Sequence, residues 1–190
     1  MPPPRLFLVA PEMDAAHLAD CLQAACAAGD VASLLVPPAQ AKDIAALAQS
    51  LNVAVLTTGE PRDCLRAGCD GLHVNADGAD LSSLRAAIGK TAILGAYAGG
   101  SRHLAMEAAE AGADYVALSQ AANSGGEPIV AWCAALLEIP CVAFDPVEAA
   151  GLDILLPQNP DFIRPADAMW ASADAAARIV SELTKRLQSA

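Results

Sequence analysis

The sequence predicts a single (β/α)8 barrel that spans residues 1–190. Two observations carry this prediction. A short phrase, in which a small apolar residue and Gly lead to an Asp and an apolar run, occurs four times at nearly even spacing, around Gly29, Gly68, Gly112 and Gly151. Eight continuously apolar runs also alternate with Ala-rich segments that are typical of helices. Strands that alternate with helices predict a parallel sheet, and eight of them favour a closed barrel over an open sheet.

The apolar runs are the expected strands. Four of them follow the four copies of the phrase, at 31–36, 71–74, 114–119 and 153–156, and four lie between copies, at 5–10, 53–57, 92–97 and 140–144. Their continuous apolar character suits parallel strands that are buried on both faces. Each phrase is interpreted as a helix end, where Gly takes the left-handed conformation. The last two runs are so close together that the seventh helix is expected to be rudimentary.

Composition limits the function classes. The net charge of −11 argues against nucleic acid binding, which depends on clustered Lys and Arg. Charges or Pro interrupt every apolar run before it reaches membrane-spanning length, and no signal peptide is recognised, so a cytoplasmic protein without membrane contact is expected. The six cysteines contain no metal-binding spacing and are expected to be reduced thiols.

The chemistry of such barrels lies at the C-terminal ends of the strands. After the fourth run, Asn75, Asp77 and Asp80 offer three oxygen donors that suit Mg²⁺, whereas a turn followed by a helix cap is the structural alternative. His73, inside that run, is interpreted either as a hydrogen-bonded core residue or as a proton-transfer group.

Two glycine-containing loops are candidates for phosphate binding. Gly99, Gly100 and Ser101 precede an expected helix, where backbone N–H groups favour an anion, although Ser101 is equally suited to be an N-cap. Arg102 follows in the first helical turn, where a cation opposes the helix dipole unless an anion lies nearby, and it joins His73 as a catalytic candidate. Asn123 and Ser124 lie in a loop that either closes over a ligand or forms a plain turn.

These motifs resemble the thiamine phosphate synthase family, which includes the TenI-type thiazole tautomerases. The resemblance rests on residues 67–74 with Asp80, on Ile93–Gly95 with Ser101, on 111–116 and on 139–143. It implies a reaction that joins an aminopyrimidine methyl diphosphate to a thiazole phosphate with the help of Mg²⁺. It also implies that Asp80 is a metal ligand and that Ser101 contacts a phosphorylated small molecule.

The chain also departs from the family pattern at four loops. Residues 34–38 carry no charge where the family has Gln-Leu-Arg-Glu-Lys, and residues 57–59 replace an Asn-Asp-Arg that supplies a metal ligand. Residues 121–125 lack the family's Lys, and residues 144–146 replace a phosphate-binding Gly-Gly. Three functions therefore compete: a synthase with weak or lost activity, a non-catalytic ligand-binding or regulatory barrel, and a thiazole tautomerase. A homo-oligomer is compatible with each of them.

Overall fold

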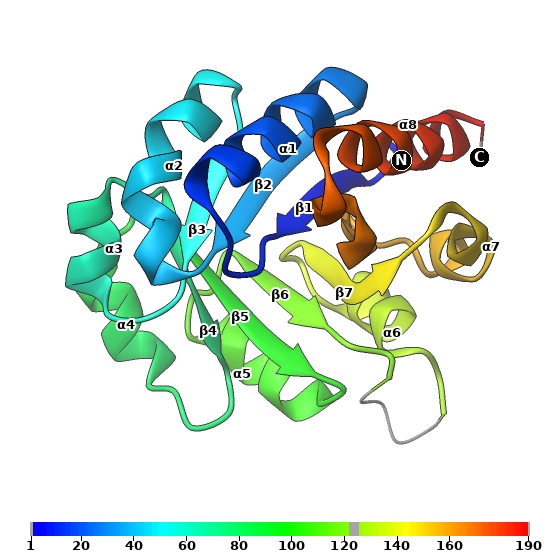
Figure 1. Cartoon of the computed structure of the whole chain (residues 1–190). Helices are drawn as coiled ribbons and strands as arrows, with labels where there is room; N and C mark the ends of the chain where they lie inside the picture. Colours follow the sequence, from blue (N-terminus) through cyan, green and yellow to red (C-terminus); the bar gives the residue numbers. More distant parts are fainter. Residues whose placement is uncertain (1, 122–125, 190) are drawn as a thin grey trace.

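Eight parallel strands close into a barrel in chain order in the computed structural model, which describes residues 2–121 and 126–189 (Figure 1). Each strand pairs with its neighbours in sequence, and β1 closes the barrel against β8. The predicted barrel is therefore confirmed. The strands are β1 (Arg5–Val9), β2 (Val31–Val36), β3 (Ala54–Thr57), β4 (Gly71–Asn75), β5 (Ile93–Gly99), β6 (Tyr115–Leu118), β7 (Cys141–Val147) and β8 (Phe162–Pro165).

Helices surround the barrel, and α8 lies alongside α1 near both chain ends (Figure 1). They are α1 (Ala15–Ala28), α2 (Pro38–Ser50), α3 (Pro61–Ala67), α4 (Leu81–Ile88), α5 (Arg102–Glu110), α6 (Ile129–Leu136), α7 (Leu152–Leu155) and α8 (Ala173–Gln188). Short 3₁₀ helices flank α7 and precede α8, at Ala149–Gly151, Leu156–Gln158 and Asp167–Ala171. Within the described part of the chain, none of these helices has the length and apolar character needed to cross a membrane.

The prediction of the eighth strand is wrong. Residues 153–156 belong to α7 and the 3₁₀ turn after it, and the strand lies at Phe162–Pro165. Leu152 is fully buried whereas Ile154 is 78% exposed, so the apolar run presents one face to the core as a helix does. The true strand has only four residues and contains Arg164, so it lacks an apolar run. The short seventh helix is confirmed, but it occupies the place predicted for the strand.

The glycine prediction holds at two of the four phrases. Gly68 and Gly112 have φ values of 75° and 87°, the left-handed region that favours Gly. Gly29 is extended and Gly151 is helical, so neither needs that freedom. At Gly29 a Cβ atom would overlap the side chains of Val180 and Thr184 on α8. Gly29 is therefore explained by the close approach of α8 to the end of α1.

Aspartates have a structural role at the start of the even-numbered strands, and two of them, Asp70 and Asp114, belong to the repeated phrase, whereas Asp161 does not. Each of three aspartates donates its backbone N–H to a carbonyl of the preceding strand and accepts the N–H of that same residue on its carboxylate; we call this pair of bonds the aspartate clamp. The pairs are Asp70 with Val55, Asp114 with Leu94 and Asp161 with Cys141, with carboxylate–amide distances of 2.7, 2.7 and 2.8 Å. Before β2, Asp30 instead binds Arg5 of β1, at 2.8 Å.

The core has two parts. Helix faces and the outward side chains of the strands form the larger cluster, which contains most of the buried Leu, Ala and Cys residues. Inward side chains form a smaller cluster inside the barrel, made of Phe7, Leu35, Leu56, Tyr115, Ala117 and Val142. All six cysteines are free thiols, and five of them are buried.

Replacing Asp161 tests the aspartate clamp. In Asp161→Ala the N–H of Cys141 loses its acceptor, so we expect the free energy of unfolding to fall by about 1–3 kcal/mol. Urea denaturation measures the change. The control is Asp43→Ala, which alters an exposed aspartate on α2 and should shift stability by less than about 0.5 kcal/mol. Equal effects of the two substitutions would contradict the role of the clamp.

Candidate functional site

A stack of aromatic rings fills the barrel below the C-terminal ends of the strands. His73 of β4 lies nearly parallel to Tyr115 of β6 and to Phe144 of β7, with ring centroids 5.8 and 5.4 Å apart. Phe7 meets the Tyr115 ring edge-on at 5.5 Å, and Tyr97 contacts Phe144 at 5.3 Å. The mouth of the barrel, by which we mean the C-terminal ends of the strands with the loops that follow them, therefore has an aromatic floor.

His73 is the polar centre of this stack. Its Nδ1 lies 2.7 Å from the hydroxyl of Tyr115, and burial lowers the pKa of the imidazole to about 4. Burial also raises the pKa of Tyr115 well above its usual value, so both groups are neutral near pH 7. A buried and hydrogen-bonded ring matches the interpretation of His73 as a core residue. A role in proton transfer stays a prediction.

Gly95 makes room for this pair. A Cβ atom at Gly95 on β5 would overlap the ring of Tyr115, so only Gly allows the ring to lie where its hydroxyl reaches His73. The residues that meet here come from β4, β5 and β6, which are neighbours in the barrel. Sequence reasoning missed both Gly95 and Tyr115 as parts of the site, because it assigned them only to strands.

Arg164 is a second residue that sequence reasoning missed. Arg164 lies in β8 directly after Ile163, whose side chain packs outward. The guanidinium of Arg164 lies 5.2 Å from the ring centroid of Phe144. Nη2 donates to Asp167 at 2.7 Å and Nη1 donates to the carbonyl of Phe144 at 3.3 Å. Its Nε is buried and has no partner among the described residues. Because the eighth strand was predicted at 153–156, Arg164 was not recognised as a residue of the strand that ends at the mouth.

The acidic loop after β4 forms a turn and a cap. Asn75 accepts the N–H of Asp77 at 3.1 Å, and Asp80 is the N-cap of α4. Both carboxylate oxygens of Asp80 are bound by Ser83, one by its N–H and the other by its hydroxyl, and these bonds lower the pKa of Asp80. The structural alternative from the sequence therefore describes this loop.

The loop after β4 offers few free oxygen ligands for Mg²⁺. The described residues contain no group of three His, Cys, Asp or Glu side chains arranged to hold a metal ion. Asp77 remains beside an Asp80 whose oxygens already accept hydrogen bonds, so this donor set fits Mg²⁺ only when a substrate supplies further oxygens. Metal binding by Asp77 and Asp80 stays a prediction.

At the end of β5 the predicted anion site is also a helix cap. The hydroxyl of Ser101 accepts the N–H of Leu104 at 3.2 Å, and Gly99 has a φ of 56°. Arg102 turns away toward α6, where it approaches Glu127 at 3.7 Å and lies over the ring of Trp132 at 5.2 Å. Phosphate binding by Gly99, Gly100 and Ser101 stays a prediction, and Arg102 is already engaged with protein groups.

The loop after β6 is tied to β7. Ser119 donates its hydroxyl to Asp145 at 2.6 Å, and the N–H of Ala121 binds the other carboxylate oxygen at 3.0 Å. Asp145 therefore anchors the loop instead of standing free in the mouth. The predicted ligand-closing residues Asn123 and Ser124 lie outside the described residues.

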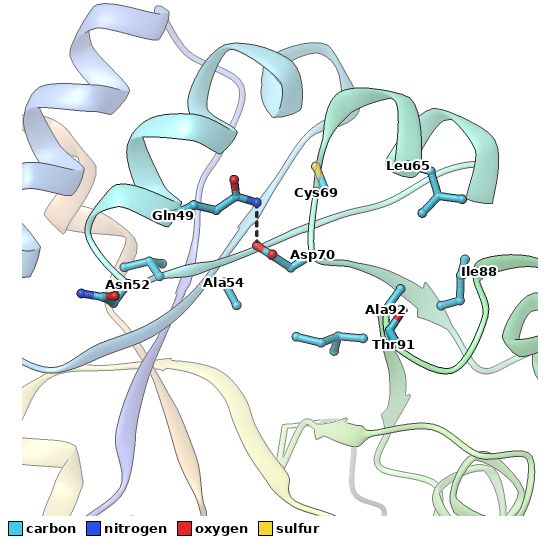
Figure 2. Close-up of a pocket in the computed structure, with 11 residues that line it drawn as sticks. Gln49, Asn52, Ala54, Leu65, Cys69, Asp70, Ile88, Thr91 and Ala92 are labelled. Carbon is cyan, nitrogen blue, oxygen red and sulfur yellow. Dashed lines mark hydrogen bonds between the residues drawn. The ribbon is translucent and has the colours of Figure 1, made fainter.

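A groove of about 580 Å³ lies at the opposite end of the barrel, where β3, β4 and β5 begin (Figure 2). Figure 2 shows Gln49 of α2 reaching Asp70, the residue that clamps β3, with Leu65 and Ile88 farther along the wall. Stability, and not catalysis, is the usual role of this end of such barrels. We therefore place the candidate site at the mouth.

Comparisons with known proteins agree with this architecture. The family model described as thiamine monophosphate synthase matches residues 6–153, and thus most of the chain. A thiamine-phosphate synthase of Rhodospirillum centenum is 32% identical, over 95% of this chain and 96% of its own length. The chain belongs to the thiamine monophosphate synthase family.

Further relatives extend the comparison. A thiamine-phosphate synthase of Erythrobacter litoralis is 33% identical over 86% of this chain and 71% of its own length. Among solved structures, thiamine phosphate pyrophosphorylase from Pyrococcus furiosus superposes with a TM-score of 0.79 at 18% identity, covering 97% of this chain and 96% of its own. At that identity the superposition supports the fold, and the sequence relatives support the family.

Substituting Gly95 tests the fit between β5 and Tyr115. We expect Gly95→Ala to lower the free energy of unfolding by about 1–3 kcal/mol, because the added methyl group overpacks the barrel interior. Urea denaturation measures this cost. In a Tyr115→Leu background, which lacks the ring atoms that the methyl group would meet, the same substitution should cost clearly less. An equal cost in both backgrounds would show that Tyr115 is not the obstacle.

The buried His73 predicts a loss of stability in mild acid. Its pKa is lowered from 6.5 to about 4 by burial, so below pH 6.5 the unfolded chain binds a proton that the folded protein does not. Stability should therefore fall as the pH drops from 6.5 toward 4, by about 2 kcal/mol between pH 7 and pH 5. Urea denaturation of the wild type and of His73→Asn at both pH values measures it. The variant should lack this part of the slope; parallel slopes would contradict the assignment.

Proposed function

We propose that this family member binds a phosphorylated small molecule at the mouth of the barrel and makes thiamine phosphate weakly or not at all. The observation that carries the proposal is that most charged side chains at the mouth already form hydrogen bonds or ion pairs with other protein groups. Asp80 is bonded to Ser83, Asp145 to the loop after β6, and Arg102 is turned to Glu127. Arg164 is the cation that β8 contributes there, over the aromatic floor; its Nη2 pairs with Asp167, whereas its Nε is buried and has no partner among the described residues.

Phosphate chemistry explains why this matters. A diphosphate leaving group and a second phosphate need several cations or metal-bridged contacts, and each charge-assisted bond contributes about 1.5–3 kcal/mol. After β2 and β3, the positions at which the family carries charged residues supply none, because residues 34–38 and 57–59 are uncharged. The loss of even two such contacts corresponds to about a thousandfold in rate. Binding needs fewer contacts, so an aromatic floor with Arg164 supports recognition better than turnover.

An activity assay tests the catalytic half of the proposal. Purified protein is incubated with the aminopyrimidine methyl diphosphate, the thiazole phosphate and Mg²⁺, beside the Rhodospirillum centenum relative as a positive control. We expect kcat/KM to be lower than that of the relative by about a thousandfold or more. Failure to complement a synthase-deficient strain is the second expected result. Turnover similar to that of the relative would refute weak activity and would point to Asp77, Asp80 and Arg102 as replacements for the missing groups.

Calorimetry with inorganic pyrophosphate tests the binding half. We expect binding at millimolar concentration, weakened about tenfold or more in Arg164→Gln, because the variant loses a charge-assisted contact. The control is Arg178→Gln, which removes an exposed Arg that pairs with Glu182 on α8 and should leave binding unchanged. Crystals grown with phosphate then show whether the anion also contacts Gly99–Ser101. No binding, or equal binding by wild type and Arg164→Gln, would overturn the role of Arg164.

A further inference from the structure

Two thiols meet where α3 ends. Cys64 lies in the last turn of the helix, Cys69 lies two residues before β4, and their side chains share a hydrogen bond. The backbone brings them together, because the N–H of Cys69 donates to the carbonyl of Cys64 at 3.2 Å. The N–H of Gly68, which is left-handed, donates to Leu65 at the same distance, and the two bonds form a Schellman motif. Only residues whose backbones lie this close together can form a disulfide bond.

The chain builds the same motif at the ends of α2 and α5. There the left-handed residues are Asn52 and Gly112, and equivalent backbone bonds are present. The residue pairs in the places of Cys64 and Cys69 are Ala48 with Val53 and Ala108 with Ala113. Hydrocarbon side chains are therefore sufficient at these two positions of the motif. The thiol pair at α3 adds chemistry that packing does not require.

One thiol of the pair borders solvent. Cys69 lines the groove at the end of the barrel where the strands begin and is 8% exposed, whereas Cys64 is 0% exposed. Figure 2 shows Cys69 on the wall of this groove, between Gln49 and Leu65. The groove has a volume of about 580 Å³ and opens to solvent, so it admits a molecule as small as hydrogen peroxide.

The hydrogen bond between the sulfur atoms prepares them for reaction. It lowers the pKa of Cys64 and, together with burial, raises the pKa of Cys69, so the two sulfurs give up one proton readily and hold the other between them. A thiolate is the form that attacks an oxidant. When the shared proton lies on Cys64, its thiol donates to the carbonyl of Gly71 at 3.1 Å. The free electron pair is then on Cys69, the residue that lines the groove.

We propose that Cys64 and Cys69 are a modification site at which hydrogen peroxide forms a disulfide bond. The sulfur of Cys69 attacks one peroxide oxygen, the O–O bond breaks, and the leaving hydroxide takes up a proton to become water. The sulfur of Cys64 loses its proton and attacks the sulfenic acid on Cys69, so that the S–O bond breaks and a second water leaves. Two thiols lose two hydrogen atoms, and the peroxide is reduced to two waters. This site lies at the opposite end of the barrel from the mouth and does not depend on the proposed function.

Oxidation of the full-length protein with hydrogen peroxide, followed by mass spectrometry, tests the proposal. The remaining thiols are alkylated in denaturant before digestion with trypsin. Trypsin cuts after Arg66, between the two cysteines, so the disulfide joins peptides 63–66 and 67–85. We expect this linked pair in most molecules and its loss after reduction with dithiothreitol. Treated protein that stays folded and lacks the linked pair would overturn the proposal.

A second thiol pair is the matched control for access. Cys133 on α6 and Cys141 on β7 also share a hydrogen bond, but they are 1% and 0% exposed. Their disulfide should form at least about tenfold more slowly, because the oxidant does not reach either sulfur. Equal rates for the two pairs would overturn entry through the groove. Cys26→Ser removes the only thiol of the six that is not buried and should leave the Cys64–Cys69 bond unchanged; a bond that requires Cys26 would contradict the proposal.

Single variants identify the residue that reacts first. Cys64→Ala gives α3 the residue that α5 has at Ala108, so the variant should fold, and the sulfenic acid on Cys69 should persist and be trapped by dimedone. In Cys69→Ala the remaining Cys64 should be trapped at least about tenfold more slowly, because it is 0% exposed. Trapping at Cys64 with none at Cys69 would overturn the proposed order of steps.

Discussion

The aspartate clamp is the interaction on which the rest of the barrel depends. A closed parallel sheet requires each strand to begin at a defined level, because a slip of one residue would turn every inward side chain outward. Asp70, Asp114 and Asp161 each bind both backbone polar groups of one residue in the preceding strand. In this way β3 is joined to β4, β5 to β6 and β7 to β8 at their starting points, and the positions of the side chains at the far ends follow.

This constraint gives the two ends of the barrel different roles. At the end where the strands begin, carboxylates bind backbone amides and arginines, as Asp114 does with Leu94 and Arg85 and as Asp30 does with Arg5. At the mouth, the loops are held by their own polar side chains, including Ser119 with Asp145 and Asp80 with Ser83. Because these carboxylates already accept hydrogen bonds from loop residues, fewer groups at the mouth are free to bind a substrate and a metal. The same bonds that order these loops thus support the proposal of weak synthesis.

Between the two ends, the aromatic stack joins distant strands through a buried polar pair. His73 and Tyr115 are hydrogen-bonded to one another, and burial favours the neutral form of each group. The pair has room only because β5 carries Gly95 beside the ring. Phe144 stacks on the imidazole and also lies under the guanidinium of Arg164, so the stack extends from β4 to β8.

The sequence by itself determined the barrel and seven of its eight strands, because these depend on local patterns that repeat along the chain, and its motifs resemble those of the family. Only the tertiary structure decided the rest. A run such as 153–156 suits a strand or a helix equally well until Leu152 meets the core and Ile154 meets solvent. The bond between His73 and Tyr115 joins residues 42 positions apart, and no local pattern indicates it. Arg164 is a mouth residue only because β8 points it over Phe144, and the direction of a side chain follows from strand register, which the closed sheet sets.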